Sequence, residues 1–246
     1  MTGTAEFRST VTIMRSGAVV ATAEPGRDGR YSVDVPLVEG VNMFTARAAN
    51  HAGTSAPSVE VTVVRDTTAP VLDWTPADQT GFFDPTVTVS GTVADEFSGV
   101  ATLEVNGAAV PVAPGGAFAT VLDLVEGENT VTVVATDGLG NKRVEVRTVR
   151  LFPYSAEWTF AGQGTALNVF LAIEDQGGRP VRADAVTLVI RDASGAVAHG
   201  QAMSWLDTKY KATVLRLPAG TYTVWAEVDI AGWRVTTPGG EVRRRH

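Results

Sequence analysis

An internal repeat constrains the fold of this 246-residue chain more than any other feature of its sequence. Residues 28–42 reappear as residues 115–129, a shift of about 87 positions, and each copy ends on Leu-Val-Glu-Gly-x-Asn. The register continues beyond this block, because residues 49–54 fall on residues 136–141. Self-similarity at a fixed period is typical of tandem modules, each of which is one structural unit. We therefore predict two copies of one module within residues 1 to about 150.

The apolar residues alternate with a period of two and almost nowhere with the helical period of 3.6. Clear examples are residues 86–93 and residues 186–190. Val and Thr together make up about a quarter of the chain, and such β-branched residues favour strands. Turn signals such as Asn106-Gly107 and Gly177-Gly178 separate the alternating runs. The sequence predicts an all-β fold of tandem, Ig-like β-sandwich modules with very little helix.

Both copies contain the same turn between two strands. Gly40 and Gly127 occupy the position at which a left-handed backbone is needed, and glycine adopts it without steric cost. Asn42 and Asn129 follow two residues later, where an amide side chain can hydrogen-bond the backbone of the turn. Each copy is thus expected to contribute a hairpin to one wall of a sandwich.

Several motifs of the second copy belong together. They are residues 66–70 (Asp-Thr-Thr-Ala-Pro), 87–95, 105–107 (Val-Asn-Gly), 124–129 and 135–141. The chain here resembles bacterial Ig-like repeats, including those of the glucodextranase B-domain type. The match covers nearly all of residues 66–150 and, more loosely, residues 3–65. The resemblance implies a sandwich fold and a role of the kind such modules have in adhesins, surface-layer proteins and the non-catalytic parts of secreted hydrolases.

The repeat register divides the chain into three modules. We expect an Ig-like module without its first two strands at 1–66, a complete one at 67–151, and a third β-sandwich of different type at 152–246. The first is short because residues 70–90 have no counterpart ahead of Gly3. We expect the chain to be a segment of a longer polypeptide. The alternative is self-association, in which a strand from a neighbouring chain completes the first module.

The third module resembles Ig-like and transthyretin-like accessory domains in residues 215–224, where Pro218 and Gly220 form a strand-turn-strand corner. We expect Tyr222 to pack its ring inward and to bond backbone near this corner through its hydroxyl. Strands are predicted at 165–173, 185–190, 210–215 and 221–228.

Residue types that carry catalysis are scarce. The chain has no Cys, and His51, His199 and His246 are far apart without a second ligand at metal-binding spacing. The Gly-x-Ser-x-Gly, Gly-x-x-x-x-Gly-Lys and Gly-x-Gly-x-x-Gly motifs are absent from the sequence. We therefore predict no catalytic and no cofactor-binding residue, and expect that the chain is not an enzyme.

Two binding hypotheses remain. Hard oxygen ligands for Ca²⁺ are offered by Asp66, Asp95, Glu96, Asp137 and Asn141, although the same residues serve equally as caps of turns. Four of the five Trp residues fall in the third module, and Trp205 and Trp233 lie near turns, where exposed rings would suit a polysaccharide. The alternative for these two rings is packing in the core or between domains.

Charge and hydropathy exclude other partners. With 20 Lys and Arg against 27 Asp and Glu there is no basic excess for nucleic acid, and no apolar run is long enough for a membrane span. We predict a non-catalytic structural, spacer or adhesion segment of a secreted or cell-surface bacterial protein, which contacts other modules or surface proteins. The alternatives are a carbohydrate-binding accessory region of a secreted glycoside hydrolase or protease, and a filament subunit completed by strand donation.

Overall fold

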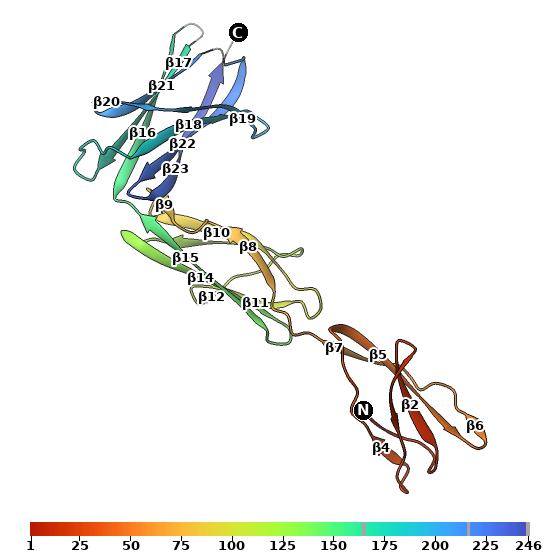
Figure 1. Cartoon of the computed structure of the whole chain (residues 1–246). Coiled ribbons are helices and arrows are strands. Elements are labelled where there is room, and N and C mark those ends of the chain that lie inside the picture. Colours follow the sequence, from red (N-terminus) through yellow and green to blue (C-terminus); the bar gives the residue numbers. More distant parts are fainter. Residues whose placement is uncertain (164–165, 216, 245–246) are drawn as a thin grey trace. The chain divides into compact units, whose positions relative to one another are not determined.

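The computed structural model describes residues 1–163, 166–215 and 217–244, and within these ranges it holds strands and no helix (Figure 1). No helix in that part of the chain is therefore long and apolar enough to cross a membrane. The all-β prediction is confirmed. Thr165 and His246 lie outside the described residues.

The chain divides into two compact units. The first comprises Met1–Leu72, Val93–Thr102 and Ala135–Arg143, and the second comprises Asp73–Thr92, Leu103–Val134 and Val144–His246. The loops at one end of the second predicted module thus belong with the first module, and the remainder of it belongs with the third.

The first module consists of two small sheets. Strand β1 pairs with β4 in one of them, and the other has the order β3-β2-β5-β6, with β7 also paired to β5. Its fully buried apolar residues are Val11, Ile13 and Phe44. The strands are β1 (Thr2–Thr4), β2 (Thr10–Arg15), β3 (Ala18–Ala23), β4 (Arg30–Ser32), β5 (Gly40–Asn50), β6 (Gly53–Thr54) and β7 (Val61–Arg65).

The second module has counterparts of six strands of the first, all except β6, and adds two strands. Gly91 of β10 pairs with Phe118 of β13, as Gly3 of β1 pairs with Tyr31 of β4. The added strands β8 and β9 join β10 and β15 respectively. The strands are β8 (Val71–Thr75), β9 (Thr80–Phe82), β10 (Thr86–Ala94), β11 (Val100–Val105), β12 (Ala108–Ala109), β13 (Ala117–Asp123), β14 (Gly127–Asp137) and β15 (Lys142–Leu151).

The predicted turn is present in both copies. Gly40 and Gly127 have φ of 88° and 94°. The amide oxygen of Asn42 accepts from Val38 N at 2.9 Å, and its Nδ2 donates to Val38 O at 2.7 Å and to Gly40 O at 2.9 Å. Asn129 makes the three equivalent bonds to Val125 and Gly127.

The third module contains the four predicted strands and four more. One sheet has the order β16-β17-β21-β20, and β23-β22-β18-β19 form part of a larger sheet. As predicted, Tyr222 is buried and its hydroxyl donates to Pro218 O at 3.1 Å. The strands are β16 (Tyr154–Gln163), β17 (Ala166–Asp175), β18 (Ala185–Arg191), β19 (Val197–Ala202), β20 (Ser204–Leu206), β21 (Lys209–Leu215), β22 (Gly220–Ile230) and β23 (Trp233–Arg244).

Within the second unit, strand β9 joins the second and third modules. It pairs in parallel with β15 (Val149↔Thr80) and also with β23 (Val235↔Gly81), so one sheet of nine strands contains strands of both modules. Gly81 is buried at this point. A Cβ atom there would lie 2.6 Å from Val235 Cγ2 and 3.0 Å from Phe152 Cε2, so the close packing of the three strands requires glycine.

Candidate functional site

Three carboxylates from separate segments converge in the first unit. Asp66 follows β7, Asp95 follows β10 and Asp137 ends β14, and one oxygen of each lies within 4.8 Å of the others. Asp66 is 6% exposed and Asp137 is 2% exposed, whereas Asp95 is partly exposed. We call these three residues the aspartate cluster.

Hydrogen bonds from neutral groups fix Asp66 in place. Its Oδ1 accepts from the backbone N of Thr68 at 3.1 Å and from the hydroxyl of that residue at 2.7 Å. Its Oδ2 accepts from Ser98 N at 3.1 Å. Ser98 lies in the loop that Asp95 begins, so this bond ties the segment after β7 to the loop after β10.

Asp95 and Asp137 each organise their own loop. Asp95 Oδ1 accepts from the backbone N atoms of Ser98 and Gly99, both at 2.9 Å. Asp137 Oδ1 accepts from Leu139 N at 2.9 Å and from Asn141 N at 2.8 Å. These are the local side-chain-to-backbone bonds by which Asp stabilises turns.

Asn141 connects two members of the aspartate cluster. Its Nδ2 donates to Asp137 Oδ2 at 2.7 Å and to the backbone oxygen of Asp66 at 3.0 Å. The side chain thus orients the Asp137 carboxylate and holds the backbone at Asp66.

The surroundings favour the ionised form of the two buried carboxyls. Hydrogen bonds from Ser98 and Thr68 lower the pKa of Asp66 to about 2. At Asp137, burial raises the pKa, but hydrogen bonds from Asn141, Leu139 and Ser98 outweigh this effect and leave the pKa below its ordinary value. Both groups are therefore negatively charged at neutral pH.

This arrangement has the chemistry of a site for a hard divalent cation. Ca²⁺ prefers carboxylate and carbonyl oxygens, and the cluster presents three carboxylates. Oδ2 of Asp66 accepts from Ser98 N, Oδ2 of Asp137 accepts from Asn141 Nδ2, and the Ser98 hydroxyl also hydrogen-bonds both carboxylates.

The structure separates the five predicted calcium ligands into two groups. Asp66, Asp95 and Asp137 come together and Asn141 bonds two of them, whereas Glu96 is exposed and does not belong to the cluster. Sequence reasoning missed Ser98. Its position three residues after Asp95 was the available signal, because Asp commonly bonds backbone N atoms of the next few residues.

The predicted carbohydrate rings lie against the core of the third module. Trp205 is partly buried and packs edge-on against Tyr210, with ring centroids 4.9 Å apart. Trp233 is also partly buried, and the Arg150 guanidinium lies 6.0 Å from its ring centroid. Neither ring forms a fully exposed platform, and polysaccharide binding by them stays a prediction.

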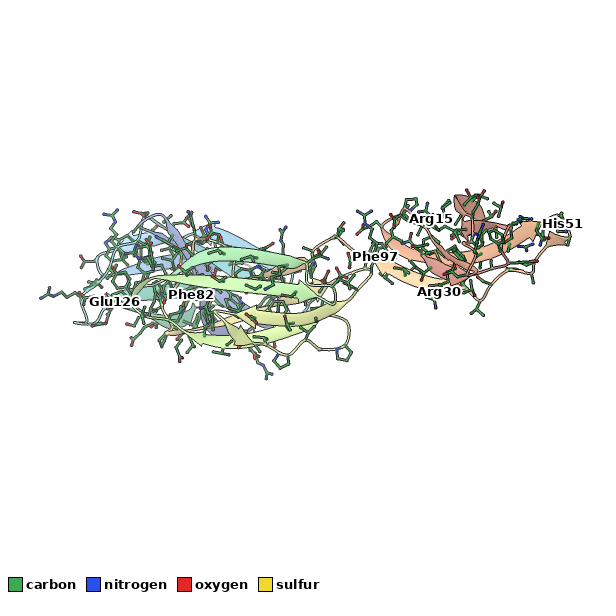
Figure 2. All side chains as sticks on the ribbon, turned by 90° about the horizontal axis from the view of Figure 1, so that it is seen from below. Arg15, Arg30, His51, Phe82, Phe97 and Glu126 are labelled. Carbon is green, nitrogen blue, oxygen red and sulfur yellow. The ribbon has the colours of Figure 1, made fainter. Side chains whose placement is uncertain are left out.

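Two of the three histidines, His51 and His199, lie in the part of the chain that the structure describes. His51 is exposed in the turn after β5 (Figure 2). His199 Nε2 lies 2.8 Å from Gln201 Oε1 on β19.

The second module is similar to a known protein family. Residues 72–152 match the model of the family described as "Glucodextranase, domain B". The predicted resemblance to Ig-like repeat modules is confirmed. The chain is also similar to Bacillopeptidase F of Bacillus subtilis (strain 168), with 33% identity over 141 residues. That match covers 57% of this chain and 10% of the length of the relative.

Solved structures of tandem modules are also similar to the chain. A tetra-tandem repeat in the extending region of a large adhesion protein is 22% identical, with 98% of this chain and 69% of that chain covered and a TM-score of 0.30. The I-band fragment I67–I69 of titin is 10% identical, with 98% and 92% covered and a TM-score of 0.43.

Proposed function

We propose that this chain is a non-catalytic spacer segment of an extracellular protein, which holds neighbouring domains at a set separation. The continuous nine-stranded sheet of the second unit carries this proposal, because β9 bonds to strands of two successive Ig-like modules. Backbone hydrogen bonds across a joint resist bending more strongly than a flexible linker does. The relative named as a peptidase supports the narrower version, an accessory region of an extracellular protease.

Aromatic packing reinforces the same joint. Phe152 stacks on Tyr154 with ring centroids 5.7 Å apart, and Phe83 lies edge-on to both at 6.5 and 6.2 Å. These residues come from the segment after β9 and from the junction of β15 and β16. Ring pairs in this geometry stabilise packing by about 1 kcal/mol each beyond burial. The joint thus has both a hydrogen-bonded and an apolar part.

The experiment measures the distance between spin labels on the two modules. Because the chain has no Cys, labels at Val121→Cys and Val197→Cys are specific, and both positions are exposed, at 63% and 58%. Double electron–electron resonance is expected to give one narrow distance distribution. A broad or multi-peaked distribution in the unmodified joint would contradict the spacer function.

The joint itself is tested by Gly81→Val in the labelled protein. A side chain there meets Val235 and Phe152, so the distribution is expected to broaden. Gly162→Val is the matched control, because no atom lies within 4 Å of the added Cβ. Equal broadening in both variants would show that β9 does not hold the joint.

We also propose that the aspartate cluster binds Ca²⁺ and thereby stiffens the segment between β7 and β8. Three carboxylates with oxygens within 4.8 Å repel one another, two of them are over nine-tenths buried, and a divalent cation would relieve that repulsion. Bound calcium would fix Asp66 against the loops that begin at Asp95 and Asp137.

Thermal melts with CaCl₂ and with EDTA test the cation. Binding to the folded state alone raises the melting midpoint. Asp137→Asn is expected to abolish the rise, whereas Glu96→Gln, the matched control at an exposed neighbour, is expected to keep it. Equal melting midpoints of the unmodified chain in CaCl₂ and in EDTA would show that the aspartate cluster does not bind Ca²⁺.

A further inference from the structure

A cleft of about 740 Å³ lies in the second unit, where the second and third modules meet. Strand β9 lines it with Thr80 and Phe82. The second module adds residues of β8 and β10, and the third module adds residues of β22 and β23. Clefts of this volume at the junction of two domains commonly bind small ligands.

Aromatic and proline rings supply the apolar part of this cleft. Trp225 of β22 is partly exposed, whereas Val224 and Ala226 on either side of it are buried. Because side chains alternate along a strand, Trp225 lies on the outer face of its sheet and not in the core of the third module. Pro238 pairs with Trp225 on the neighbouring strand, and Phe82 is partly exposed on β9. The cleft thus presents an indole face to solvent.

Threonine hydroxyls supply most of the polar part. Thr86 and Thr88 are exposed at alternate positions of β10, and Thr236 is exposed on β23. Each hydroxyl can donate one hydrogen bond and accept others. Among the described residues that line the cleft, Asp84 alone carries a charge, and it is exposed. This lining suits an uncharged ligand that has many hydroxyl groups.

The strands beside the cleft offer few backbone groups to a peptide. Strand β9 is paired on both edges, with β15 and with β23. At the end of β8 the Arg147 guanidinium donates to Trp74 O and, at 2.8 Å, to Pro76 O. Proline also lacks an N–H group. A peptide that extends a sheet needs free backbone groups at the sheet edge. The lining therefore favours a ligand that is bound through side chains.

We propose that this cleft binds an uncharged oligosaccharide. The face of a pyranose ring carries positively polarised C–H groups, and the face of the Trp225 ring is negatively polarised, so the two stack. Hydroxyls of the sugar then bond the hydroxyls of Thr86, Thr88 and Thr236. The Asp84 carboxylate accepts a charge-assisted hydrogen bond from the sugar. No Lys or Arg among the described residues lines the cleft to pair with a phosphorylated or acidic glycan.

This inference rests on the joint that β9 forms and not on the spacer function. It also places sugar recognition at a ring other than the two predicted from the sequence. Neither Trp205 nor Trp233 is among the residues that line the cleft in the described part of the chain. Trp225 instead lies between hydroxyl-bearing strands of two modules.

Isothermal titration calorimetry of the full chain with neutral hexasaccharides tests the proposal. The probes are cellohexaose, laminarihexaose, xylohexaose, maltohexaose, mannohexaose and the hexamer of N-acetylglucosamine. We expect saturable binding of at least one of them. Trp225→Ala is expected to weaken that binding roughly tenfold, because the stacking ring is lost, whereas Trp225→Phe keeps a ring and is expected to retain most of the affinity.

A second variant separates lost binding from lost folding. Thr88→Val replaces an exposed hydroxyl with a methyl group of similar shape, so it is expected to weaken binding roughly threefold. Its melting midpoint is expected to stay unchanged. Thr223→Val is the matched control, because Thr223 is exposed on β22 two residues before Trp225 and is not among the residues that line the cleft.

Three results would overturn the proposal. One is the absence of binding heat with all six hexasaccharides. Another is equal affinity of the Thr88→Val and Thr223→Val variants, or of Trp225→Ala and the unmodified chain, for the sugar that binds. The third is saturable binding of a decaproline peptide in a titration series in which the sugars give no heat, because the cleft would then accept a proline-rich peptide.

Discussion

Asn42 is the residue on which the turn before β5 depends. Its side chain is 0% exposed and makes three hydrogen bonds to Val38 and Gly40. Asn42→Ala leaves these backbone groups without partners, so we expect the free energy of unfolding of the first module to fall by about 2 kcal/mol. Hydrogen exchange of residues 38–44, recorded at increasing urea concentrations, measures this loss of unfolding free energy.

Asn129 and Asn50 provide the comparison for that change. Asn129 makes the same bonds but is partly exposed, and water can replace the lost side chain, so Asn129→Ala is expected to cost about 1 kcal/mol. Asn50→Ala removes bonds at a partly buried position with exposed partners and is expected to cost about 0.5 kcal/mol or less. Equal losses in all three variants would contradict the role assigned to burial.

The ionisation of Asp66 makes stability depend on pH. Its folded-state pKa of about 2 lies below the ordinary 3.8, so the folded state favours the charged form. That stability is fully present above about pH 4 and is lost as the pH falls through about 2. We expect melts in EDTA to show a steeper loss of stability over this range in the unmodified chain than in Asp66→Asn. Parallel curves of melting midpoint against pH for the two proteins would contradict this role of Asp66.

At the scale of residues, the sequence predicted local geometry well and burial less well. The glycine and asparagine of the repeated turn were identifiable because their chemistry acts over two to four positions. Asp66, Asp95 and Asp137 were singled out by residue type and loop position. Their convergence depends on how β7, β10 and β14 end in space, which no local pattern encodes.

Among the elements, β21 is tied to the segment before β18 by one buried hydroxyl. Tyr210 is 3% exposed, and its hydroxyl accepts from Ala183 N at 2.7 Å and donates to Ala183 O at 3.0 Å. Burial raises the pKa of this phenol, so the hydroxyl stays protonated near neutral pH. Tyr210→Phe leaves both backbone groups unpaired and is expected to destabilise the third module by about 2 kcal/mol.

Tyr222→Phe is the control for this element. Among the described residues its hydroxyl donates to Pro218 O, so the expected loss is about 1 kcal/mol. Urea titrations followed by tryptophan fluorescence report both, because the Trp205 ring lies 4.9 Å from the Tyr210 ring. A Tyr210→Phe variant as stable as the unmodified chain would show that the Ala183 backbone finds other partners.

Elements with a strong alternating pattern were predicted, and those defined by distant pairing were not. The predicted strands at 185–190 and 221–228 correspond to β18 and β22. Strand β9 was missed because Thr80–Phe82 spans three residues beside Asp and Pro. Its two parallel partners are about 70 and about 155 positions away, so no local periodicity marks it.

For the whole molecule, the shared sheet predicts the order of unfolding. The second and third modules are joined through β9, so we expect them to unfold in one transition. The first module has three fully buried apolar residues and should lose protection at a lower urea concentration. All five Trp residues lie outside it, so fluorescence follows the joined modules while hydrogen exchange of β2 and β5 follows the first.

Gly81→Val decides whether β9 is the cause of this coupling. The added side chain separates β9 from Val235 and Phe152, so the single fluorescence transition should become two, with Trp74 reporting the second module and the other four Trp residues the third. Trp74→Phe in the same background should remove the component that belongs to the second module. Because Gly162→Val adds a side chain in open space, it should keep one transition. Two transitions in the unmodified chain would mean that hydrogen bonds through three residues of β9 are too few to couple two sandwiches.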